Sequence, residues 1–228
     1  MEPRPPDPIT ARNILRIVPE RVVMLSNFFA KARRKTVRLP DWRVHQISSF
    51  IRYVGLYAGD LNETYRTDRL DSLAQAMRNL MELSVWVKFC ESSEEEAKRF
   101  FDDGLRDFRE VVEVLQKTYT KENKAPQKRL DEILSAVKSV APKFNISDVE
   151  ASYIRVNDAA GKVGKQDIHS VFYKVASKFA HPTALLLLMR EPFAGMQDSI
   201  YEIGAKLADE CLKALEKTVT NTYGDIEV

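Results

Sequence analysis

The chain has 228 residues, of which 44% are hydrophobic and 30% are charged, and its formal net charge is +2. This composition is ordinary for a globular protein, and so small a net charge does not by itself indicate a nucleic-acid partner. Only 8 glycines are present, which is too few for an all-β protein with its many turns. The two cysteines, Cys90 and Cys211, are far apart, so we predict neither a disulfide framework nor a zinc site.

The first residues, MEPRPPDP, are rich in proline and charge, and no apolar stretch of the signal-peptide kind follows them. The longest apolar run, Ala184 to Met189, is too short to span a bilayer. We therefore predict a cytoplasmic protein with no membrane partner. Its expected divisions are a disordered tail over residues 1–9, a helical domain over 10–220 and a C-terminal tail over 221–228.

The hydrophobic pattern of the first half has the period of helices. It predicts them over residues 10–35, 40–65, 68–90 and 93–118. Thr10 is the expected N-cap of the first helix, and Pro19 should kink or divide that helix. The sequence SEEE at residues 93–96 is a capping box, in which the serine accepts a backbone N–H and the third glutamate reaches back.

The second half continues with the same period. It predicts helices over residues 128–140, 147–160, 167–181 and 196–218. A second capping box, SDVE, stands at residues 147–150 and starts the helix predicted over 147–160. Asp167 is the expected N-cap of the helix over 167–181, and Pro182 ends that helix. Neither an internal repeat nor the alternation of a β-strand is present. We therefore predict an all-α fold, a single bundle of about seven helices.

Polar residues recur at intervals of four on two of these helices, so each set lies on one helix face. Tyr173, Ser177 and His181 form one set, and Arg78, Glu82 and Trp86 form the other. In one interpretation the sets make a pocket where His181 is an acid or base, Glu82 orients it and Arg78 holds an anion. In the other, which we favour, they are a hydrogen-bonded network that fixes how the helices pack.

Other features give weaker indications. A basic run could contact phosphates, or could simply be a solvated helix end: Lys31, Arg33, Arg34, Lys35 and Arg38. His45 has no set of polar residues around it, His169 sits in the first turn of its helix, and Cys90 has no nearby histidine. Paired Glu-x-x-His motifs, a glycine-rich phosphate loop and cysteines at metal spacing are all missing, so we expect no metal and no cofactor.

The stretch RNLMELSVWVKF, followed much later by YKVASKFAHPT, resembles an uncharacterised branch of bacterial helical proteins similar to the HEPN group. The resemblance covers about Trp42 to Lys217 and implies a HEPN-like bundle. Active HEPN proteins are metal-independent ribonucleases of toxin–antitoxin or phage-defence systems. Their motif is an arginine, usually a polar residue, and a histidine four to six residues after the arginine, commonly at a homodimer interface. Carried over, His181 is the histidine, Lys174 replaces the arginine, and Val175 stands where the polar residue is usual.

Two functions follow as expectations. The missing arginine before His181 favours a non-catalytic interaction or nucleic-acid-binding module, whose partner would be a protein such as an antitoxin, or RNA. The alternative is a metal-independent ribonuclease in which His181 is the acid–base residue and Arg78 with Lys174 stabilises the phosphate. The basic run favours this alternative, and the resemblance adds a homodimer to the expected partners.

Overall fold

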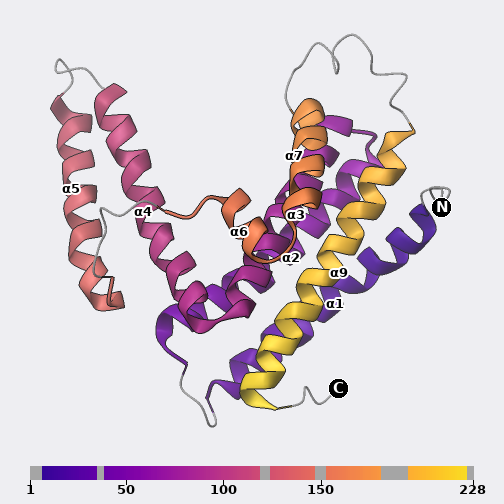
Figure 1. Ribbon diagram of the computed structural model, residues 1–228, viewed down its shortest axis with the longest axis horizontal. Helices are drawn as coiled ribbons and strands as arrows, with labels where there is room; N and C mark the ends of the chain where they lie inside the picture. Colours follow the sequence, from indigo (N-terminus) through magenta and orange to yellow (C-terminus); the bar gives the residue numbers. More distant parts are fainter. Residues whose placement is uncertain (1–6, 35–38, 119–123, 147–152, 181–194, 225–228) are drawn as a thin grey trace.

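The computed structural model describes residues 7–34, 39–118, 124–146, 153–180 and 195–224. Within these ranges the chain is helical and contains no strand, which confirms the predicted all-α bundle (Figure 1). The elements are α1 (Pro8–Ala32), α2 (Asp41–Arg66), α3 (Leu70–Ser92), α4 (Glu94–Thr118), α5 (Lys124–Val140), η1 (Ala141–Phe144), α6 (Val156–Lys162), α7 (Gln166–Ala180) and α9 (Met196–Tyr223). No helix in the described ranges combines the length and the apolar character that a membrane crossing requires.

Helix α3 is the centre of the bundle, and it contacts α2, α4, α6, α7 and α9. Its sequence explains this position, because apolar residues occupy most of its circumference and such a helix is stable only when it is surrounded. Leu73, Met77, Leu80 and Met81 are all buried. The first and last helices, α1 and α9, pack against each other, and α9 also lies along α2 and α3.

The start of α1 differs from the prediction. Asp7, and not Thr10, is the N-cap, and its side chain accepts a hydrogen bond from the backbone N–H of Thr10 at 3.0 Å. Pro8 then takes the first helical position, where the missing N–H of proline costs nothing. Pro19 does not divide the helix, since α1 continues through it to Ala32.

Polar pairs fasten the outer helices to α9. Arg21 of α1 reaches Asp209 at 2.6 Å and Glu216 at 2.9 Å. The hydroxyl of Tyr65 in α2 donates to Asp198 at 2.5 Å, and this hydrogen bond, aided by burial, raises the pKa of Tyr65 to about 12. These contacts fix the register of α1, α2 and α9.

Helix α4 begins where the capping box predicts, since the Glu96 N–H donates to Ser93 Oγ at 3.1 Å. Its first half packs on α2 and α3, and its second half extends away from the bundle with α5 beside it (Figure 1). The helix predicted over residues 147–160 is wrong in its middle, because α6 begins only at Val156. The physical reason is Asp103, whose buried carboxylate accepts the N–H of Ile154 at 2.9 Å. The capping box at residues 147–150 lies outside the described residues.

Candidate functional site

The two predicted polar sets meet between α3 and α7. Arg78 Nε donates to Glu82 Oε1 at 3.0 Å within α3, and Arg78 Nη2 donates to the hydroxyl of Tyr173 in α7 at 3.0 Å. The guanidinium carbon also lies 4.3 Å from the centre of the Tyr173 ring. We call Arg78, Glu82, Tyr173 and the neighbouring His169 the Arg78 cluster.

The charge of Arg78 is balanced inside this cluster. The side chain of Arg78 is 19% exposed and that of Glu82 is 30% exposed, so solvent screens their attraction only in part. Glu82 is thus the partner of Arg78. With one edge on Glu82 and another on Tyr173, the guanidinium is oriented by the bundle.

His169 is the member that sequence reasoning undervalued. It is 4% exposed, and neither ring nitrogen has a hydrogen-bond partner among the described residues. Its ring stacks on Tyr173 with 5.5 Å between the centroids. Burial lowers the pKa of His169, which Glu82 opposes and Arg78 reinforces. A signal was present, because His169 precedes Tyr173 by four residues and so extends the same polar set by one turn.

The remaining predicted residues of α7 do not join these contacts. Ser177, one turn after Tyr173, is half-buried, and Lys174 is exposed. His181 and Pro182 lie outside the described residues, so the proposed role of His181 stays a prediction.

The basic run lies elsewhere. Lys31, Arg33 and Arg34 are exposed at the end of α1, and Lys35 and Arg38 lie outside the described residues. Phe29 beside them contacts Tyr223 in the last turn of α9, with 5.9 Å between ring centroids. Figure 1 shows this end of α9 well away from α7. The described part of the basic run and the Arg78 cluster are therefore separate surfaces.

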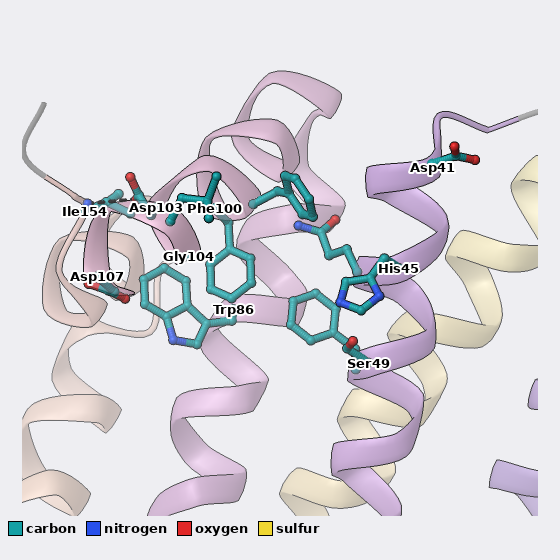
Figure 2. Close-up of a pocket in the computed structure, with 13 residues that line it drawn as sticks. Asp41, His45, Ser49, Trp86, Phe100, Asp103, Gly104, Asp107 and Ile154 are labelled. Carbon is teal, nitrogen blue, oxygen red and sulfur yellow. Dashed lines mark hydrogen bonds between the residues drawn. The ribbon is translucent and has the colours of Figure 1, made fainter. Parts of the chain in front are cut away.

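A second site, which the sequence did not indicate, is a cavity of about 640 Å³ between α2, α3 and α4 (Figure 2). Its walls are aromatic: Phe50, Trp86, Phe100 and Phe101. Phe100 lies between two of the others, 5.4 Å from Phe50 and 4.7 Å from Trp86 by ring centroids. Such a volume and lining are typical of sites for apolar ligands or anchoring side chains.

The charged groups of this cavity are carboxylates, from Asp41, Asp103 and Asp107, with His45 and Ser49 at the α2 side. Asp103 is already engaged, because it accepts from Arg106 Nη1 at 2.7 Å as well as from the Ile154 N–H. Burial raises the pKa of the Asp107 carboxyl, and the nearby carboxylates of Asp103 and Glu110 raise it further. Negative charge is thus crowded on the α4 side of the cavity.

Both cysteines are free and buried. Burial raises the pKa of Cys90 and of Cys211 to about 12 in each case. A thiol with such a pKa is almost wholly protonated near neutral pH, and the thiolate is the nucleophilic form. Neither cysteine is therefore suited to nucleophilic catalysis. The described residues bring together no group of three His, Cys, Asp or Glu side chains that could hold a metal ion.

The model of one protein family, described as a family of unknown function (DUF5677), matches residues 65–192, which is more than half of the chain. The chain belongs to this family. The DUF5677 match runs from the end of α2 through α7, so it includes the whole Arg78 cluster and the α3 and α4 walls of the cavity. Comparison with curated proteins and with solved structures gave no match.

Proposed function

We propose that this chain is a HEPN-like helical module that binds a partner and does not cleave RNA. The observation that carries the proposal is the state of Arg78, which is held by Glu82 and Tyr173. A ribonuclease site needs a cation that is free to grip the phosphate in the transition state. An arginine whose charge is balanced by a carboxylate would have to break that pair first, which costs free energy.

The cation that the HEPN resemblance puts before the histidine is Lys174, and it is a poor substitute for arginine. An ammonium group is a point charge and lacks the planar fork that binds two phosphate oxygens together. Lys174 is exposed on α7, and its side chain makes no hydrogen bond or ion pair with the described residues of the Arg78 cluster. The missing planar fork of Lys174 supports binding over catalysis.

One observation favours the alternative, a metal-independent ribonuclease of a toxin or phage-defence system. Lys31, Arg33 and Arg34 are exposed together at the end of α1, where they are available to RNA phosphates. In this alternative His181 would be the acid–base residue, and Arg78 would leave Glu82 to stabilise the phosphate with Lys174. The proposed location is the cytoplasm under either function, which suits two buried free thiols.

The test is incubation of the purified protein with a pool of structured and single-stranded RNAs in the presence of EDTA. His181→Ala is the informative variant, and His45→Ala is the matched control because His45 lies on α2, in the other site. We expect no cleavage by any of the three proteins. Cleavage by the wild type and by His45→Ala, but not by a folded His181→Ala, would establish the ribonuclease instead.

A further inference from the structure

The apolar lining of the cavity continues out of it along α4. Gly104 lines the cavity, and the next residues on its side of the helix are Phe108, Val111 and Leu115. These three side chains are 47%, 55% and 40% exposed. We call the cavity together with Phe108, Val111 and Leu115 the α4 surface. An apolar row of this kind on a polar helix commonly marks an interaction site.

Helix α5, which packs beside the second half of α4, does not cover Phe108, Val111 and Leu115. Val112 is buried on a different side of α4, and Leu130 of α5 is buried as well. Gln116 donates to Asp131 of α5 at 2.6 Å, so α5 occupies the side of α4 to which Val112 and Gln116 belong. The second half of α4 therefore has two apolar sides, one packed and one exposed.

Carboxylates predominate beside the α4 surface, and one of them, Asp103, is already paired with Arg106 at 2.7 Å. Asp107 and Glu110 flank the exposed row, and Asp41 and Asp103 line the cavity. Burial raises the pKa of the Asp107 carboxyl, and the carboxylates of Asp103 and Glu110 raise it further. A cationic group bound beside Asp107 and Glu110 would relieve the repulsion between these carboxylates. The preferred occupant is thus apolar on one side and positively charged beside it.

We infer that the α4 surface binds an amphipathic helix of a partner protein, whose bulky apolar anchor enters the cavity and whose Lys or Arg residues lie beside Asp107 and Glu110. The inference rests on the proposed function, since it names the partner of a binding module. A helix fits better than a small molecule because Gly104 to Leu115 extends about 16 Å along α4 at 1.5 Å per residue. A ligand confined to the cavity would leave the exposed row uncovered.

The experiment is a selection of displayed 16-residue peptides, randomised in an amphipathic helical pattern, on the full-length protein. We expect enrichment of peptides with apolar residues three and four apart and with flanking Lys or Arg. Enriched peptides are then synthesised, and their affinity for the wild type and for two variants is measured by fluorescence anisotropy.

The variants are Val111→Glu on the α4 surface and Val171→Glu on α7, two exposed valines at 55% and 58%. We expect Val111→Glu to weaken binding by at least about tenfold and Val171→Glu to leave it unchanged. Selection of acidic peptides, no enrichment at all, or equal effects of the two variants would overturn the inference. RNA cleavage in EDTA by the same preparation would instead overturn the proposed function, so the two failures are distinguishable.

Discussion

Gly204 of α9 and Leu61 of α2 approach so closely that no side chain fits between them. A Cβ atom at position 204 would lie 2.5 Å from Leu61 Cδ2 and 2.8 Å from Leu61 Cδ1. Leu61 is fully buried, so its side chain has little room to move away. The absence of a side chain at Gly204 therefore sets how closely α2 and α9 pack.

We predict that Gly204→Ala lowers the free energy of unfolding by about 1–3 kcal/mol, because the added methyl group overpacks this contact. The matched control is Gly59→Ala in α2, where an added Cβ meets nothing within 4 Å. Alanine is the better helix former, so the control should stabilise the protein by about 0.5–1 kcal/mol. Urea denaturation of both variants measures the difference. Equal stabilities for the two alanine variants would show that the contact is not tight.

His169 should make stability depend on pH. Burial lowers its pKa from the ordinary 6.5, so the folded protein keeps the ring neutral. As the pH falls through 6.5 the unfolded chain takes up a proton that the folded protein does not, and stability is lost. His169→Phe removes this loss and also removes two ring nitrogens without partners among the described residues. Urea midpoints at pH 8 and pH 5.5 measure the effect, and an unchanged midpoint difference in the variant would refute it.

Asp107 should have the opposite dependence. Its pKa is raised above the ordinary 3.8, first by burial and then by Asp103 and Glu110. Above pH 3.8 the unfolded chain releases a proton that the folded protein retains up to its higher pKa, so stability falls as the pH rises through this window. Asp107→Asn should therefore be more stable than the wild type at pH 7, and the gain should shrink as the pH is lowered. A thermal melt series checks this, and a less stable variant at pH 7 would contradict it.

Much of the fold was predictable because helix signals are local. The SEEE capping box placed the start of α4 correctly, since both partners of the cap lie within four residues. The start of α6 was not predictable in this way. Its position depends on Asp103, which lies 51 residues from Ile154 in sequence and binds its N–H. Local helix signals contain no information about such a contact.

The two candidate sites also differ in how far the sequence predicts them. Spacing alone identified Arg78, Glu82 and Tyr173 as two polar sets, but only packing of α3 against α7 shows that the sets meet. The sequence does not predict the cavity. Its lining residues Phe50, Trp86 and Phe100 lie on three different helices, and each has the pattern of an ordinary core residue. An incompletely filled space between helices is a property of their arrangement and not of any one pattern.

The central claim is that Arg78 stabilises the packing of α3 against α7 and does not take part in catalysis. The free energy of unfolding of Arg78→Ala tests this claim most directly. The control is Arg66→Ala, which removes another intrahelical ion pair whose side chains are 70% and 61% exposed. We predict a loss of about 1–3 kcal/mol for Arg78→Ala, because Glu82 and Tyr173 lose their partner, and less than about 0.5 kcal/mol for the control. If Arg78→Ala were as stable as the control, Arg78 would be free to serve a ligand or a substrate, and the account would be wrong.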